Sequence, residues 1–157
     1  MLCPNLNRDK GLQLTKEVYD MLRACDASVA VCPVFEEDGV MPDCTGLDVS
    51  ALEKELDHAD MIITFGGDGT MLHSVHVLDG AAVPLLGVNL GRLGYLTEVE
   101  ADDIRGALTR FDAGAEEGGW TLDERMMLDV GAVDGDGQAI GTWRALNEGV
   151  VEKLISG

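Results

Sequence analysis

A glycine-rich turn, placed where an apolar segment gives way to a helix, constrains this chain most strongly. Residues 62–65 (IITF) are apolar enough to form a buried strand, and residues 66–70 (GGDGT) follow them directly. Glycines permit positive φ angles and let a ligand approach the backbone, while the next helix directs free N–H groups and the positive end of its dipole at the turn. The pattern therefore predicts a phosphate-binding turn between a strand and a helix.

One carboxylate, Asp68, lies inside this turn. A carboxylate repels the phosphates that the N–H groups attract, which suggests that Asp68 acts on a neutral group beside them, such as a hydroxyl about to be phosphorylated. The alternative is a tight strand-to-helix turn in which Asp68 caps the helix. The turn taken alone leaves both interpretations open.

The acidic composition limits the partners that we expect. With 29 acidic and 11 basic residues the formal net charge is −18, which disfavours binding along a nucleic-acid backbone or an anionic membrane surface. No apolar run reaches the roughly 18 residues of a transmembrane helix, and no secretory signal is recognisable. The four cysteines show no metal-ligand spacing and are expected to be free thiols in the cytoplasm. A single nucleotide stays compatible with this charge, because local N–H groups, a few basic residues and Mg²⁺ hold it.

Apolar strands alternate with helical patterns along the first two thirds of the chain. Expected strands cover residues 1–3, 28–35, 61–65 and 85–89, and expected helices cover residues 10–26, 70–78, 101–111 and a short segment that begins with a capping box of Ser50 and Glu53. This order predicts an α/β fold, a Rossmann-like parallel sheet with helices on both faces. Ligands of such sheets bind beyond the carboxyl ends of the strands, which places the 66–70 turn and the 89–96 loop on the same rim.

The pattern changes after a glycine-rich linker at residues 114–119. Apolar residues alternate over 126–132, residues 134–137 (DGDG) are a strong hairpin signal, and residues 138–152 resemble a further strand. We therefore expect an N-terminal α/β nucleotide-binding domain over residues 1–115 and the beginning of a C-terminal all-β domain over residues 120–157. About one hairpin cannot bury both faces of a sheet, so we expect this antiparallel β domain to be cut short, its remainder missing or supplied by a partner.

Three motifs in order give the chain a family resemblance. They are residues 66–70 (GGDGT), residues 89–97 (NLGRLGYLT) and residues 145–148 (ALNE), and with them the chain resembles the NAD kinases. The glycine turn is shared with diacylglycerol and sphingoid-base kinases and, more loosely, with phosphofructokinases, whereas the other two motifs favour NAD kinases. The alternatives are a lipid kinase of this superfamily and a non-catalytic nucleotide-binding fragment that needs a partner β domain.

The resemblance implies an activity and a set of site residues. NAD kinases transfer the γ-phosphoryl group of ATP, or of polyphosphate in some members, to the 2′-hydroxyl of the adenosine ribose of NAD, with Mg²⁺ or another divalent cation. By resemblance, Asp68 corresponds to the proton acceptor and contacts the NAD together with Gly69, and Asn147 and Glu148 match the pair that holds the dinucleotide. His73 stands where the family often places a basic residue against the nucleotide; its alternative is a surface histidine of the helix.

The resemblance also bears on mechanism and assembly. A carboxylate at a helix N-terminus is a weak base, but a loose phosphoryl-transfer transition state asks for little early proton removal, so Asp68 is expected to orient the hydroxyl more than deprotonate it. NAD kinases continue beyond the Asn-Glu motif into a β-rich domain that completes the NAD pocket and the oligomer contact. This implies a homo-oligomer for the full-length protein and little or no activity for the present chain alone.

Smaller expectations concern other residues of the turn and the loop. Thr70 is expected to cap the helix through its hydroxyl, and Gly94 to serve loop conformation. Tyr95 and Leu96 are expected to pack beneath the loop. Arg92 is long enough to reach a phosphate, although a lone arginine more often pairs with a surface carboxylate.

Overall fold

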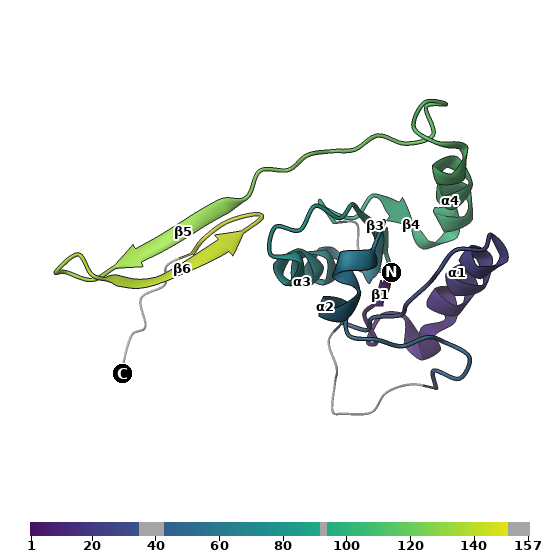
Figure 1. Ribbon diagram of the computed structural model, residues 1–157, viewed down its shortest axis with the longest axis horizontal. Helices are drawn as coiled ribbons and strands as arrows, with labels where there is room; N and C mark the ends of the chain where they lie inside the picture. The colour runs from purple at the N-terminus through teal and green to yellow at the C-terminus, as the bar shows by residue number, and fades with distance from the viewer. Residues whose placement is uncertain (35–42, 92–93, 151–157) are drawn as a thin grey trace. The chain divides into compact units, whose positions relative to one another are not determined.

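The computed structural model describes residues 1–34, 43–91 and 94–150. These fall into two units, Met1–Leu122 and Asp123–Gly157, each described here by itself. The elements in chain order (Figure 1) are β1 (Leu2–Pro4), η1 (Lys10–Leu12), α1 (Gln13–Ala24), α2 (Leu52–Glu55), η2 (Leu56–His58), β2 (Ile62–Gly66), α3 (Asp68–Leu78), β3 (Leu85–Asn89), β4 (Val99–Glu100), η3 (Ala101–Asp103), α4 (Ile104–Ala113), β5 (Leu128–Val133) and β6 (Ala139–Ala145).

The first unit contains a parallel sheet of four strands in the order β1-β2-β3-β4. In its centre Ile63 of β2 is paired with Leu2 of β1 on one side and with Leu86 of β3 on the other. Parallel bridges from Val31 and Val34 extend the sheet beyond β1. The connection from β2 to β3 passes through α3, as the alternation of strand and helix in the sequence predicts, whereas the short strand β4 was not predicted.

Helices cover both faces of this sheet, which confirms the expected fold class. Figure 1 shows α1 and α4 on one side of the strands and α2 and α3 on the other. Along β2, Ile63 and Phe65 pack with Val18 of α1, whereas Ile62 packs with Leu78 of α3. Because successive side chains of a strand point to opposite faces, a strand covered on both sides is buried along its whole length, and all five residues of β2 are buried.

The segment expected as a strand over residues 28–35 forms isolated bridges instead of a continuous strand. Towards β1, the N–H of Val34 donates to the Pro4 carbonyl; on the outer side, the N–H of Val31 donates to the Asp48 carbonyl. Pro33 has no N–H with which to continue the outer ladder, so pairing stops there. Residue 35 lies outside the described residues.

The capping box expected at Ser50 and Glu53 is wrong. Helix α2 begins at Leu52, its N-cap is Ala51, and no side chain caps it. The N–H of Ser50 donates to the Val31 carbonyl at 3.0 Å, so the Ser50 backbone pairs with the edge of the sheet. The sheet contact therefore delays the start of the helix.

Two buried thiols lie beneath α2 and α3. Cys3 of β1 and Cys32 belong to the apolar cluster on this face, and none of the four cysteines, all within the described ranges, forms a disulfide. A hydrogen bond with Cys32, followed by burial, raises the pKa of the Cys3 thiol far above its ordinary range. Cys3 is therefore a neutral core side chain at physiological pH.

Helix α1 begins later than residue 10, and a buried aspartate stabilises its start. Gly11 and Leu12 have positive φ angles of 70° and 55°, which separate η1 from α1. The Asp9 carboxylate accepts hydrogen bonds from the N–H of Leu14 at 3.1 Å, the N–H of Thr15 at 2.9 Å and the Thr15 hydroxyl at 2.6 Å. It thereby satisfies N–H groups that the first helical turn leaves without intrahelical partners.

We expect Asp9→Ala to lower the free energy of unfolding of the chain by about 1–3 kcal/mol, because it leaves buried donors unsatisfied. Thr15 has no exposed surface and Asp9 is 5% exposed, so the Thr15 donors are shielded from bulk water in the native structure. Urea unfolding followed by circular dichroism measures this change. The control is Asp20→Ala on the exposed face of α1, expected to stay within about 0.5 kcal/mol. Equal unfolding midpoints for the two variants would contradict the role of Asp9.

The second unit contains the expected hairpin, with β5 antiparallel to β6. In its turn the Asp134 carboxylate accepts hydrogen bonds from the N–H groups of Asp136 and Gln138, and Gly137 has a φ of 81°. Strand β6 ends at Ala145, earlier than the expected residue 152. Val133 and Ile140 are 65% and 66% exposed, because two strands alone cannot bury their apolar side chains.

Candidate active site

A cavity of about 640 Å³ lies at the carboxyl ends of the first three strands of the sheet. Its walls come from the segments that follow β1, β2 and β3, and within the described part of the chain its lining consists of Asn5, Arg8, Gly66, Gly67, Asp68, Gly69, Thr70, Asn89, Gly91 and Gly94. The 66–70 turn and the loop after β3 thus share one rim, as expected from the topology of parallel sheets. Among these described residues, Asp68 carries the only carboxylate.

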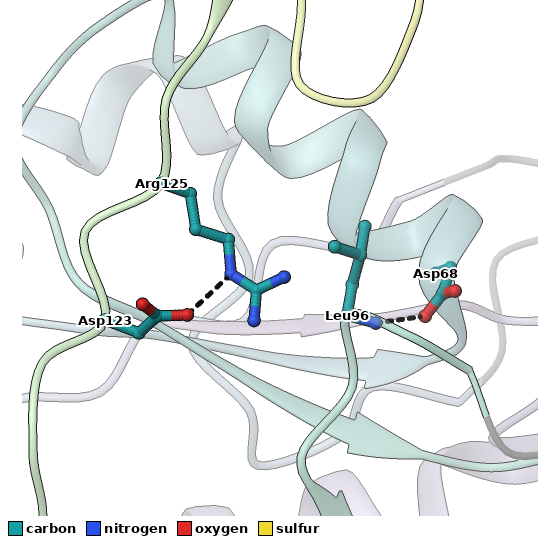
Figure 2. A network of polar contacts seen from close by, with 4 residues as sticks. All are labelled: Asp68, Leu96, Asp123 and Arg125. Atoms are coloured by element: carbon teal, nitrogen blue, oxygen red, sulfur yellow. Dashed lines mark hydrogen bonds and ion pairs between the residues drawn. The ribbon is translucent and has the colours of Figure 1, made fainter.

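Asp68 connects the two loops through its side chain. Its carboxylate accepts hydrogen bonds from the N–H of Tyr95 at 2.8 Å and from the N–H of Leu96 at 3.0 Å. Figure 2 shows the carboxylate at the start of α3 and the Leu96 contact as a dashed line. Such bonds to an ionised group are strong, and they hold the side chain in one orientation.

The alternative in which Asp68 caps the helix is wrong. Gly67 is the N-cap of α3, Asp68 is the first helical residue, and no side chain makes a cap hydrogen bond. The Asp68 carboxylate instead contacts backbone groups 27 and 28 residues further along the chain. A carboxylate can accept about four hydrogen bonds, so contact with the loop is compatible with contact with a substrate hydroxyl.

The glycines of this turn and loop do not have the positive φ angles that glycine permits, and two of them are required for close packing. Gly66, Gly67, Gly69 and Gly94 are not among the residues with positive φ. A Cβ atom on Gly66 would lie 2.8 Å from the Thr70 Cβ, and one on Gly94 would lie 2.6 Å from the Asp68 Cγ. A Cβ atom on Gly67 or Gly69 would meet nothing within 4 Å, so these two glycines face open space where a ligand can approach.

Two asparagines support the turn and the loop. The Asn5 amide donates to the Thr70 hydroxyl at 3.2 Å, so Thr70 does not cap the helix as expected. The Asn89 side chain accepts from the N–H of Gly91 at 3.1 Å and donates to the Glu100 carboxylate at 3.2 Å. Asn5 was not predicted as a site residue; the available signal was an asparagine directly after a strand, at the rim that binds ligands.

His73 lines a different cavity from Asp68. Its cavity measures about 550 Å³ and is otherwise lined by residues 33–34, residues 49–54 and Val77. Residues five positions apart on an α-helix point about 140° away from each other, so Asp68 and His73 face different sides of α3. His76 is exposed on the same helix.

The loop after β3 places neighbouring side chains in opposite environments. Leu96 is 4% exposed, which confirms that it packs beneath the loop, whereas Tyr95 is 95% exposed and the same expectation is wrong for it. Both residues use their N–H groups to bind Asp68, and this backbone arrangement leaves only the second side chain facing the core. Arg92 lies outside the described residues.

Asn147 and Glu148 belong to the second unit, where they follow β6 and are exposed. The other dashed line in Figure 2 also belongs to this unit and joins Arg125 Nε to the Asp123 carboxylate at 3.0 Å. Both side chains of this pair are substantially exposed, and ion pairs in such positions contribute little to stability.

A divalent cation would depend on substrate phosphates at this site. In residues 1–34, 43–91 and 94–150, no group of three or more His, Cys, Asp or Glu side chains is arranged to hold a metal. Mg²⁺ commonly keeps several waters and binds through one or two carboxylates together with substrate phosphates. The Asp68 carboxylate and the open space around Gly67 and Gly69 fit this mode of binding.

Known proteins match both the sequence and the structure. The ATP-NAD kinase N-terminal domain family matches residues 1–115. The chain belongs to the NAD kinase family. The NAD kinase of Natranaerobius thermophilus is 33% identical over 154 residues, which are 97% of this chain and 50% of that protein. The NAD kinase of Symbiobacterium thermophilum is 36% identical over 150 residues, 94% of this chain and 50% of that protein.

A solved structure also matches the fold of this chain. A crystal structure of yeast NADH kinase in complex with NADH has the same fold, with a TM-score of 0.67 and 19% identity, over 93% of this chain and 46% of that one. The chain spans about half the length of the curated relatives it matches. No helix in the described ranges is long and apolar enough to cross a membrane.

Proposed function

We propose that this chain is the nucleotide-binding part of an NAD kinase, which phosphorylates the 2′-hydroxyl of the adenosine ribose of NAD with ATP or polyphosphate and yields NADP. The observation that carries the proposal is the Asp68 carboxylate, which two backbone N–H groups hold at a cavity beside open glycines, in a member of this family. In this assignment residues 1–115 form the α/β nucleotide-binding domain, and residues 120–157 begin a β domain that contacts NAD.

Asp68 accepts a hydrogen bond from the ribose 2′-hydroxyl and directs its oxygen at the γ-phosphorus. With ATP as the donor, the bond from this oxygen to phosphorus forms while the bond from phosphorus to the β–γ bridging oxygen breaks, so that ADP leaves and the hydroxyl proton passes to the Asp68 carboxylate; with polyphosphate, the chain shortened by one unit leaves instead. The first turn of α3 lines the same cavity, and a helix N-terminus stabilises phosphate charge. A divalent cation would be held mainly through the phosphates, with the Asp68 carboxylate beside them, and would supply neutralisation of the phosphate charge.

The remaining predicted residues bind NAD. Gly69 contacts NAD beside Asp68, because no side chain obstructs it. Asn147 donates and accepts hydrogen bonds through its amide, and Glu148 accepts them from sugar hydroxyls. His73 contacts the nucleotide from the other side of α3, and a structural role in its own cavity is its alternative. The full-length protein is a cytoplasmic homo-oligomer that binds neither nucleic acid nor membrane.

The decisive assay uses the longest polypeptide that the gene encodes, because the curated relatives are about twice as long as this chain. The polypeptide receives NAD, Mg²⁺ and either ATP or polyphosphate, and an NADP-specific dehydrogenase reports the product. We expect NADP with at least one donor. Labelled phosphate that appears in diacylglycerol or sphingosine and not in NADP would overturn the proposal.

The present chain alone is expected to be at least about 100-fold less active, because half of a site loses the positioning of its substrate. The same coupled assay on the 157-residue chain measures this difference. Titration of the chain with NAD in a calorimeter tests the alternative of a non-catalytic fragment. A rate equal to that of the longer polypeptide would contradict the need for the remaining β domain.

A further inference from the structure

Arg8 is the basic side chain in the described lining of the cavity that contains Asp68. It follows β1, and its N–H donates to the Asn5 carbonyl at 2.9 Å, which fixes the backbone of this segment at the rim. Its guanidinium lies against the loop after β3, because a Cβ atom on Gly91 would lie 3.4 Å from Nη1 and 3.9 Å from Cζ. The cation is thus placed between the first and the third of the segments that form the cavity.

The charge of Arg8 is not neutralised by the protein, within the residues that the structure describes. In a chain with 29 acidic and 11 basic residues, some arginines pair with acids, such as Arg105 with Glu17 at 2.7 Å and Arg144 with Asp129 at 2.9 Å, whereas Arg23 and Arg110 make no ion pair within the described ranges. Arg8 makes no such ion pair within the described ranges, although acidic side chains outnumber basic ones almost threefold. A guanidinium directed at a cavity in so acidic a chain is suited to an anionic ligand.

Arg8 also borders a smaller cavity of about 450 Å³, which is less suited to an anion. Its lining includes Glu17 and Asp102, and Glu17 is already engaged by Arg105. Among its described lining residues the larger cavity has one carboxylate, Asp68, which two N–H groups hold, and it also includes the start of α3. The larger cavity therefore offers Arg8 an environment in which phosphate charge is stabilised from two directions.

We propose that Arg8 binds a phosphate group in the Asp68 cavity and positions the substrates for phosphoryl transfer. This inference rests on the proposed function and adds a residue to it. A guanidinium binds phosphate through two parallel N–H bonds, whereas Asp68 acts on the hydroxyl. The two substrates offer two phosphate-containing groups for this contact. One is the polyphosphate chain of the donor, and the other is the pyrophosphate of NAD.

The kinetic test compares Arg8→Ala and Arg8→Lys with the parent in the longest polypeptide that the gene encodes. We expect Arg8→Ala to lower kcat/KM about 10- to 100-fold, because a hydrogen-bonded charge contact is lost, and Arg8→Lys to restore part of it. A raised KM for ATP at saturating NAD assigns the contact to the donor, and a raised KM for NAD at saturating ATP assigns it to the dinucleotide. The control is Arg110→Ala, an exposed arginine on α4 that is expected to keep the parent rate.

A binding test separates this inference from the proposed function. Calorimetric titration with inorganic tripolyphosphate is expected to show affinity at least about tenfold weaker for Arg8→Ala than for the parent, whether or not NADP is formed. Circular dichroism is expected to show that Arg8→Ala, which replaces an exposed residue, leaves the fold unchanged. Equal tripolyphosphate affinities, or a kcat/KM within twofold of the parent, would overturn the role of Arg8 and leave NADP formation by the parent as the test of the proposed function.

Discussion

Asp68→Asn is expected to lower kcat for NADP formation by about 100-fold or more in the longest polypeptide that the gene encodes. Asparagine keeps the shape of the side chain and removes its charge. Both carboxylate oxygens accept hydrogen bonds from backbone N–H groups, those of Tyr95 and Leu96. An amide nitrogen in either position would therefore place its own N–H donors against a backbone N–H donor. The substitution therefore removes the group that orients the ribose hydroxyl and also weakens its attachment to the loop.

The assay measures initial rates at saturating NAD and ATP, with KM for NAD determined separately. Asp20→Asn on the exposed face of α1 controls for a change of one charge and is expected to keep the parent rate. Thermal unfolding of both variants separates lost chemistry from lost folding. A kcat for Asp68→Asn equal to that of the parent would remove Asp68 from the reaction.

Gly94→Ala is expected to lower kcat by about 100-fold, because a displacement of roughly 1 Å in a reacting group has effects of this size. The added Cβ atom would lie 2.6 Å from Asp68 Cγ, closer than any packing distance, and the carboxylate or the loop must move. The substitution involves no positive φ angle, so backbone strain does not contribute. Unlike Asp68→Asn, it changes the position of the carboxylate and not its charge.

The matched control is Gly106→Ala in α4, where the added Cβ atom would meet only the flexible end of Arg110. It is expected to keep the parent rate and to stabilise the helix by up to about 1 kcal/mol. Because Gly94→Ala acts through Asp68, its effect in the Asp68→Asn background is expected to be much smaller than in the parent. Full additivity of the two substitutions would show that Gly94 acts elsewhere.

The fold class followed from local patterns in the sequence. Continuous apolar runs such as residues 62–65 predict strands buried on both faces, and residues 134–137 predict the hairpin turn. These features depend on the character of consecutive residues. Element ends were less well predicted, because Ser50 pairs with Val31 and Pro33 interrupts an outer ladder, and both effects depend on neighbouring segments.

The location of the candidate site was predicted, whereas the contacts between its residues were predicted only in part. The glycine turn and the loop after β3 were placed on one rim, and the family was recognised from three motifs. The reasons for Gly66 and Gly94, the hydroxyl contact of Thr70 and the place of Arg8 in the cavity were missed. Each is a contact between segments far apart in the chain; Asn5 and Thr70, for example, are 65 residues apart.

The amino-acid sequence by itself determined the parallel sheet with helices on both faces, the hairpin and the family, because periodicity, turn residues and motifs are properties of neighbouring residues. Only the tertiary structure decided what Asp68 touches and why a glycine must stand opposite it. A carboxylate in a strand-to-helix turn caps a helix or crosses to another loop depending on which donors come within about 3 Å. That distance is set when β2 and β3 pair and bring their following loops together.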